Sequence, residues 1–151
     1  MMKLRLLSAI LLVLPLKVIG CPLEGYWKSD EEKTLASFRQ AKDVTPKQKE
    51  IFENNFFGKF YMHIKCKEFT SVMDDCIETS NYELLSSSSK AVTIRYTSDL
   101  EGEVVREATI EGNCYSLEIN DGQFKEYFCP VSAEAYNKAI KFAQQAAPDG
   151  Q

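Results

Sequence analysis

The strongest constraint on the fold is a succession of short segments in which apolar and polar residues alternate. In the segment 60–67 every second side chain, from Phe60 to Cys66, belongs to the apolar face, and the residues between them belong to the wet face. Alternation with a period of two is typical of a strand with one buried side. Further strand candidates, with turn signals between them, are 25–28, 69–78, 81–86, 90–97, 103–111, 113–120 and 123–129. Their close spacing predicts a mainly β domain, an antiparallel meander or up-and-down barrel of about eight strands.

One hairpin can be placed in register from its side chains. The dipeptide Asp121-Gly122 is typical of a two-residue hairpin turn. It sets the following residues opposite one another: Ile119 and Phe124, Glu118 and Lys125, Leu117 and Glu126, Tyr115 and Phe128, Cys114 and Cys129. The apolar pairs share the buried face, on which Glu126 is the one residue that does not fit. Counting from the turn predicts that Cys114 and Cys129 form a hydrogen-bonded pair, with the wider of the two Cα spacings.

Two helices are predicted directly after the first strand. Ser29 and Glu32 have the spacing of a capping box, which predicts a helix over 30–41. Thr45-Pro46 repeats this pattern with proline at the first helical position, and Gly58 stops the second helix. The helix pair therefore occupies residues 29–58.

A third helix is predicted at the C-terminal end, over 132–145. Ser132 can cap it, and its apolar residues recur at helical spacing on one side. These residues are Tyr136, Ala139, Ile140 and Ala143. We expect this helix to cover the outside of the sheet, and the tail 146–151 to be disordered.

The N-terminus has the three zones of an export signal. Lys3 and Arg5 precede an apolar run over 6–16, and a small residue, Gly20, ends the segment. The apolar run is shorter than the roughly 20 residues that a membrane-spanning helix needs, and Lys17 closes it. We therefore expect the segment 1–20 to be removed as a signal peptide.

The residues Val18-Ile19-Gly20-Cys21 resemble the lipobox of bacterial lipoproteins. The resemblance implies that Cys21 is acylated and becomes the first mature residue, with 21–24 as a lipidated tether to the bilayer. Because Pro22 is not aspartate, the family's sorting rule implies the outer membrane, facing the periplasm. The alternative is ordinary signal-peptidase cleavage after Gly20, which would give a secreted protein.

The cysteine count bears on this choice. The chain has five cysteines, so at least one has no partner within it. Acylation of Cys21 would leave an even set: Cys66, Cys76, Cys114 and Cys129. Four cysteines permit three pairings, and we favour 66–76 with 114–129, each joining neighbouring strands.

Length and charge limit the function classes. Residues 25–145 are enough for a single domain with its own core. The full chain has a net charge of −4, and removing Lys3, Arg5 and Lys17 with the signal peptide makes it about −7. An acidic chain with scattered lysines is not expected to bind nucleic acid.

The stretch Gly25-Tyr26-Trp27 and the meander that follows resemble the calycin group, which includes lipocalins and fatty-acid-binding proteins. The G-x-W motif and a terminal helix are similar to lipocalins, and the helix pair after the first strand is similar to the lid of fatty-acid-binding proteins. The phrases "GYWKSDEEKT", "FFGKF" and "KEYF" are also similar to a family of small bacterial exported proteins of unassigned function. Where fatty-acid-binding proteins place an arginine and a tyrosine, this chain has Lys125-Glu126-Tyr127, without the arginine.

No set of residues indicates catalysis. His63 is the one histidine, and it lies on the polar face of its strand, where we expect a surface imidazole. Asp74-Asp75 is interpreted as a solvated strand end, because neighbouring strand residues point to opposite faces. We expect no enzymatic activity, no metal site and no cofactor.

The resemblance implies a structural role for Trp27, as a plug at the closed end of the barrel, with ligand contact as its alternative. The other candidate ligand-contacting residues are apolar: Phe60, Met62, Ile64, Ile94, Phe124 and Phe128. A barrel of about eight strands is wide enough either to fill itself with side chains or to hold one small ligand. Two functions follow. One is a membrane-tethered binding module for a hydrophobic small molecule or lipid beneath the helical lid 29–58, and the other is a filled barrel that binds a protein partner.

Overall fold

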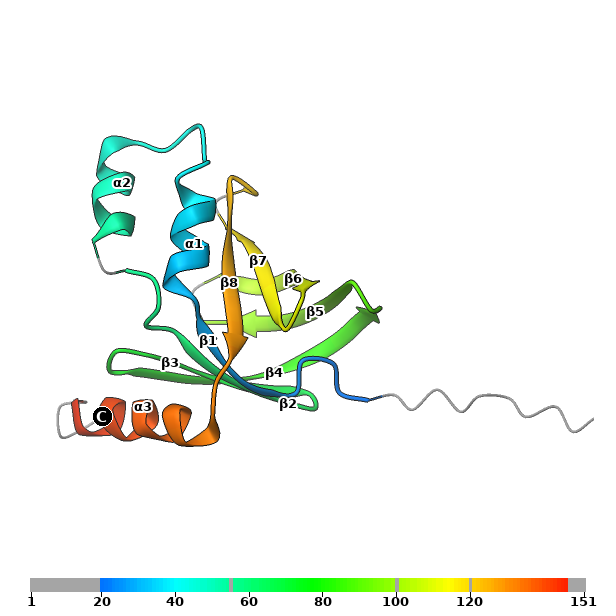
Figure 1. Ribbon diagram of the computed structural model, residues 1–151. Helices are drawn as coiled ribbons and strands as arrows, with labels where there is room; N and C mark the ends of the chain where they lie inside the picture. The colour runs from blue at the N-terminus through cyan, green and yellow to red at the C-terminus, as the bar shows by residue number, and fades with distance from the viewer. Residues whose placement is uncertain (1–19, 55, 100, 120, 147–151) are drawn as a thin grey trace, which may run out of the picture.

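The computed structural model describes residues 20–54, 56–99, 101–119 and 121–146, and within them the chain forms a closed eight-stranded barrel with three helices (Figure 1). The strands are β1 (Gly25–Ser29), β2 (Tyr61–Lys65), β3 (Glu68–Met73), β4 (Cys76–Ser87), β5 (Ala91–Ser98), β6 (Gly102–Glu111), β7 (Cys114–Ile119) and β8 (Phe124–Pro130). Each strand pairs antiparallel with its neighbour in sequence, and β1 closes the barrel on β8. The predicted up-and-down barrel is confirmed. The predicted signal peptide lies, except for Gly20, outside the described residues.

The boundary between β3 and β4 differs from the prediction. The sequence indicated strands over 69–78 and 81–86, but the chain turns at Asp74-Asp75, where Asp74 has a left-handed φ of 51°. Met73 pairs with Cys76 across this turn, and β4 continues without a break to Ser87. Asp74-Asp75 therefore forms the turn between β3 and β4, in keeping with its interpretation as a solvated strand end.

The helix pair is present, with one cap corrected. Helix α1 (Glu31–Phe38) begins after Asp30, whose carboxylate accepts a hydrogen bond from the Lys33 amide at 2.9 Å. Ser29 is instead the last residue of β1, so the predicted Ser29 cap is wrong. Helix α2 (Pro46–Glu53) has the predicted proline at its first turn and a complete capping box between Thr45 and Gln48.

The helix pair has an aromatic cluster of its own. Phe38 of α1, Phe57 and Phe124 of β8 are all buried and contact one another, and Phe52 of α2 packs against them. The rings meet at centroid distances between 5.2 and 6.4 Å, three of the six pairs edge to face and one pair, Phe52 with Phe57, stacked; edge-to-face and offset-stacked pairs are favourable aromatic geometries. This cluster fixes α1 and α2 to one end of β8.

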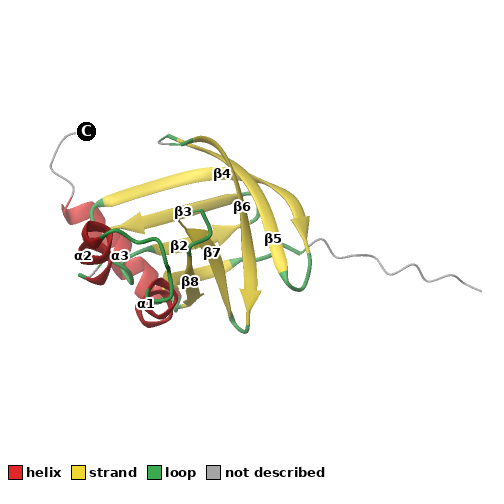
Figure 2. Ribbon diagram, turned by 90° about the horizontal axis from the view of Figure 1, so that it is seen from above, coloured by secondary structure: helices red, strands yellow, loops and turns green. Residues whose placement is uncertain are grey.

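Helix α3 (Ala133–Ala146) lies across the outside of the barrel, over β1 to β4 (Figure 2). Its predicted apolar stripe packs on Val72, and Tyr136 and Ala143 are buried there. The predicted cap is confirmed, because Ser132 Oγ accepts from the Ala135 amide at 3.1 Å. The rest of the predicted tail, 147–151, lies outside the described residues. No helix of the described chain is long and apolar enough to cross a membrane.

The β7–β8 hairpin has the predicted register, with Ile119 opposite Phe124 and Leu117 opposite Glu126. Its disulfide, Cys114–Cys129, also forms as predicted, but with a Cα–Cα distance of 4.3 Å. This is the narrow spacing, not the wide one expected for a hydrogen-bonded pair. The last paired rung of the ladder is Tyr115 with Phe128, so the cysteines lie beyond it and are not held at the wide spacing.

Candidate functional site

The barrel is not completely filled by its own side chains. It encloses a cavity of about 210 Å³ whose walls are mainly aliphatic and aromatic. All eight strands except β1 contribute to the lining, together with Pro22 and Leu23 from the segment before β1. The cavity therefore lies along the barrel interior, where the inward residues of seven strands converge.

Most of the apolar residues predicted as ligand contacts lie in this wall. The predicted residues that line the cavity are Phe60, Met62, Ile64, Ile94 and Phe128. Phe124 does not line the cavity, because it belongs to the aromatic cluster under the helix pair. Trp27 is also absent from the lining. Its ring packs edge to face on Tyr115 at 4.9 Å, in keeping with the structural role expected for it.

The helix pair does not cover the cavity. None of the described residues between 29 and 58 lines it, so the expected lid over the ligand is wrong. The helices instead pack around Phe124 at the start of β8, and Phe124 does not line the cavity. In Figure 1 the segment before β1, in blue, lies on the side of the barrel away from α1 and α2.

This N-terminal segment, residues 21–24, closes part of the cavity wall and is held in three ways. The indole Nε1 of Trp27 donates a hydrogen bond to the Leu23 carbonyl at 2.8 Å. The Glu24 amide donates to the Cys21 carbonyl at 3.3 Å, so the segment is a turn, and Leu23 has a φ of 64°. The third restraint is covalent. A strained turn that is fastened at several points has a fixed conformation, so this segment is a permanent part of the cavity wall.

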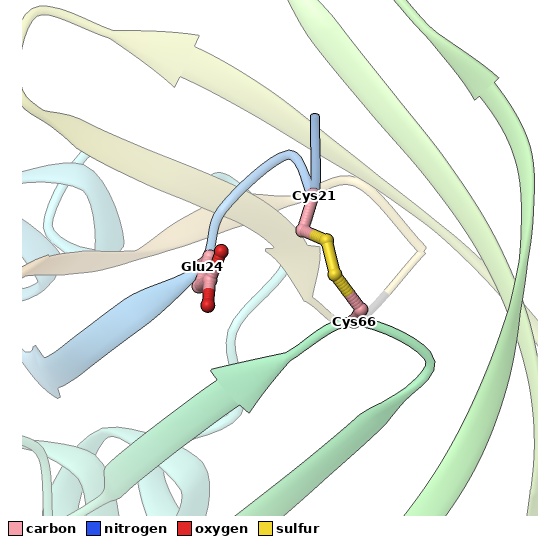
Figure 3. A group of neighbouring side chains, drawn as sticks. All are labelled: Cys21, Glu24 and Cys66. Atoms are coloured by element: carbon pink, nitrogen blue, oxygen red, sulfur yellow. A yellow bond between two sulfur atoms is a disulfide. The ribbon is translucent and has the colours of Figure 1, made fainter. Parts of the chain in front are cut away.

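The covalent restraint is a disulfide between Cys21 and Cys66, the residue after β2 (Figure 3). It corrects the expected pairing of Cys66 with Cys76. Cys66 lies near the Glu68 end of β3, and Cys76 pairs with Met73 at the other end. The five residue steps between those ends span roughly 16 Å, whereas disulfide Cα atoms lie within about 7 Å. Cys76 is exposed and has no disulfide partner.

The sulfur of Cys21 can form either a disulfide or a thioether to diacylglycerol, and the structure holds the disulfide. The odd cysteine is then Cys76, so the count of cysteines no longer favours lipidation of Cys21. Glu24 lies beside the disulfide, and one ligand atom from each of the three residues falls within 4.8 Å of the others (Figure 3). Reduced, this group would offer two thiolates and a carboxylate to a metal ion. Oxidised, its sulfurs are not thiolate ligands.

Polar groups are few in the cavity wall, and Glu126 is the most unusual of them. It lies opposite Leu117 on the inward face of β8. Its Oε1 accepts a hydrogen bond from Ser29 Oγ at 2.7 Å, and that hydroxyl in turn accepts from the Gly58 amide at 3.3 Å. Burial raises the pKa of Glu126, and the Ser29 hydrogen bond offsets part of this rise.

Three other polar side chains of the wall, those of Arg106, Tyr96 and Tyr82, have protein partners. Arg106 forms an ion pair with Glu101 at 2.8 Å and also hydrogen-bonds the Tyr96 hydroxyl. The Tyr82 hydroxyl donates to the Lys65 carbonyl at 2.8 Å. Burial raises the pKa of Tyr82 and Tyr96, so both stay neutral hydrogen-bonding groups at physiological pH.

His63 lies outside the cavity, on the outer face of β2. Its ring stacks on Tyr26 at 4.1 Å and meets Tyr136 of α3 at 5.5 Å, so it is covered more than the expected surface imidazole would be. Burial and the nearby Lys65 lower the pKa of His63. It is therefore a neutral packing residue between the barrel and α3.

Sequence reasoning missed several wall residues. Tyr82 and Tyr96 come from strands recognised as strands, but their inward direction depends on strand registers that the sequence analysis did not assign. Tyr115 was placed on the buried face by the hairpin register but was not named as a ligand contact. Glu126 carried a signal, because the hairpin register already placed it among apolar residues. Pro22 and Leu23 carried none, since the disulfide and the Trp27 hydrogen bond that hold them against the barrel form only in the folded chain.

Comparison with protein-family models, with curated proteins and with solved structures finds no match to this chain. The closed eight-stranded antiparallel barrel is the architecture that the calycin resemblance implies. What the cavity holds must therefore be inferred from the residues that form it.

Proposed function

We propose that the protein is an exported binding protein that holds a small hydrophobic molecule inside its barrel and does not transform it. The observation that carries this proposal is the apolar cavity of about 210 Å³ in a barrel of a size that side chains alone can fill. A filled barrel acting only through its surface would have no need of this space. The cavity therefore favours ligand binding over a purely surface role.

The cavity size restricts the ligand. An engineered apolar cavity of about 150 Å³ accepts benzene, so 210 Å³ corresponds to about eight or nine non-hydrogen atoms. A single ring with a short substituent fits this space, and a whole long-chain lipid does not. The proposed ligand is therefore a small molecule.

Export is supported by the signal-like N-terminus and by the two disulfides, which persist in oxidising compartments. Within this proposal the Cys21–Cys66 bond favours release after cleavage behind Gly20. The membrane-tethered lipoprotein is the competing proposal, because it needs the same sulfur for its acyl group.

Alkylation of the denatured, unreduced protein separates these two forms. The disulfide form exposes one thiol, that of Cys76, and has no acyl mass. The acylated form exposes both Cys66 and Cys76 and carries the mass of its acyl chains. Intact mass spectrometry after iodoacetamide treatment counts both.

Ligand binding itself is tested by titration with toluene, followed by amide chemical shifts. We expect shifts at inward positions of β5 to β8 and saturable binding. Ala108→Leu fills part of the cavity and should weaken binding at least tenfold. Val105→Leu, on the exposed face of the same strand, is the matched control and should change nothing. Shifts confined to the outer surface, or equal effects of the two variants, would contradict the proposal.

A further inference from the structure

Two acidic residues line the apolar cavity, Glu78 on β4 and Glu126 on β8, and the carboxylate of Glu126 is fixed in place by a hydrogen bond from Ser29. Along β8 the inward positions are Phe124, Glu126 and Phe128, and the pairing of Glu126 with Leu117 places it on the face that lines the cavity. A carboxylate removed from water is costly unless it is paired or hydrogen-bonded. What compensates Glu126 therefore bears directly on what the cavity binds.

No cation of the described chain neutralises Glu126. It takes part in no ion pair there, and no lysine or arginine is among the groups that shift its pKa. Arg106, the cationic side chain of the same wall, is bonded to Glu101 and Tyr96. The compensation that the fold provides is one hydrogen bond, from Ser29 to Oε1.

The second oxygen of Glu126 is available. Within the described chain no hydrogen bond reaches Oε2. Every fully buried side-chain oxygen of the described residues has a hydrogen-bond partner, so Oε2, which has none, is accessible. The Ser29 bond, itself fixed by the Gly58 amide, holds the carboxyl group in one orientation. One oxygen is thus anchored to the wall, and the other is free for a ligand.

The walls around this carboxylate are aromatic. Phe128 stacks on Tyr115 at 5.1 Å and meets Phe60 at 5.8 Å, and all three line the cavity with Glu126. Aromatic faces attract cations, and a carboxylate forms its strongest hydrogen bonds with charged donors. Both features favour a ligand with a positive end.

We propose that the cavity binds a small hydrophobic amine, whose ammonium group donates a hydrogen bond to Glu126 while its apolar part fills the barrel. This inference rests on the proposed function and names its ligand class. The available volume corresponds to one ring with an aminomethyl or aminoethyl substituent. The raised pKa of Glu126 in the empty barrel is consistent with a missing cation, which the ligand supplies.

Two other ligand classes fit less well. A fatty acid or other anion would place its carboxylate in the same small space as Glu126, where like charges repel. A metal ion needs several ligands together, and the one group of described residues with that geometry is Cys21, Glu24 and Cys66, which does not include Glu126.

The test compares two probes of nearly equal shape with the disulfide-bonded protein. Benzylamine carries an ammonium group at neutral pH, and benzyl alcohol is its neutral counterpart. We expect benzylamine to bind about tenfold more tightly or better, because a hydrogen bond between charged groups contributes that much. Glu126→Gln, of the same shape, should remove the preference while leaving benzyl alcohol bound. Glu118→Gln, on the exposed face of the paired strand, is the matched control and should keep it.

The outcomes separate this inference from the proposed function. If both probes bind the wild-type cavity equally, or if Glu126→Gln leaves the preference intact, the amine inference is overturned and the apolar cavity function stands. If neither probe nor toluene binds, both proposals fail. Amide spectra of the two variants verify that the barrel is folded, so that a lost preference in Glu126→Gln reports on the carboxylate and not on unfolding.

Discussion

Removing the Cys21–Cys66 disulfide is expected to destabilise the protein more than removing Cys114–Cys129. A disulfide restricts the unfolded chain, and in the chain-entropy description its effect grows with the length of the loop it closes. The sequence separations are 45 residues for Cys21–Cys66 and 15 for Cys114–Cys129. These correspond to about 4 and about 3 kcal/mol. Both are large fractions of a typical unfolding free energy of about 5–15 kcal/mol.

The assay is urea unfolding followed by the fluorescence of Trp27, the one tryptophan of the chain. Cys21→Ser/Cys66→Ser and Cys114→Ser/Cys129→Ser are made in a Cys76→Ser background, so that no free thiol can exchange with the remaining disulfide. The Cys76→Ser protein is the reference. For a domain of this size, a loss of about 4 kcal/mol lowers the melting temperature by roughly 8–16 °C.

Cys21→Ser/Cys66→Ser should also open the cavity, because this disulfide fastens the segment that carries Leu23 against the cavity wall. Exchange of bound benzyl alcohol should become faster in Cys21→Ser/Cys66→Ser, whereas Cys114→Ser/Cys129→Ser should exchange at the reference rate. An unchanged unfolding free energy for Cys21→Ser/Cys66→Ser would refute the reasoning, since it would mean that Cys21 is not bonded to Cys66 in the protein.

Three further predictions concern single side chains. Because burial raises the folded-state pKa of Glu126, the wild type should lose stability as pH rises from the unfolded carboxyl pKa through the folded one. The stability advantage of Glu126→Gln over the wild type, measured by urea unfolding across pH, should therefore grow over that window. The opposite slope would mean that the folded protein stabilises the carboxyl as an anion. Ser29→Ala leaves the Gly58 amide and Glu126 without a partner, and should cost about 1–3 kcal/mol by the same measurement. Phe124→Ala should cost about 3–5 kcal/mol and increase hydrogen exchange in α1 and α2, while toluene binding persists; loss of binding would mean that the helix pair does cover the cavity.

The fold could be read from the chain to a large extent because its signals are local. Alternation identified the strands, and the Asp121-Gly122 turn fixed the register of β7 and β8, since the side-chain period of two leaves one register that buries the apolar set. The caps at Thr45 and Ser132 involve neighbours in sequence and were likewise readable. The turn at Asp74 was less readable, because its two strands run together without a glycine or proline.

The site was read only in part. Five of the apolar residues expected at a ligand lie in the cavity wall, since inward-facing strand positions follow from the alternation. Phe124 has the same alternation but belongs to the helix cluster, because its place along β8 puts it under α1 and not beside the cavity. Periodicity gives the face of a strand on which a residue lies, and it does not give the level along the barrel axis.

From the sequence alone we predicted most of the strand and helix content, the antiparallel meander, a favoured β7–β8 disulfide and the anomaly at Glu126, because each depends on residues that are near one another in the chain. Tertiary structure decided the closure of β1 on β8, the bond between Cys21 and Cys66, and the empty space within the barrel. These depend on distances between residues remote in sequence and on how completely side chains fill a common volume. Neither quantity is fixed until the whole chain is packed.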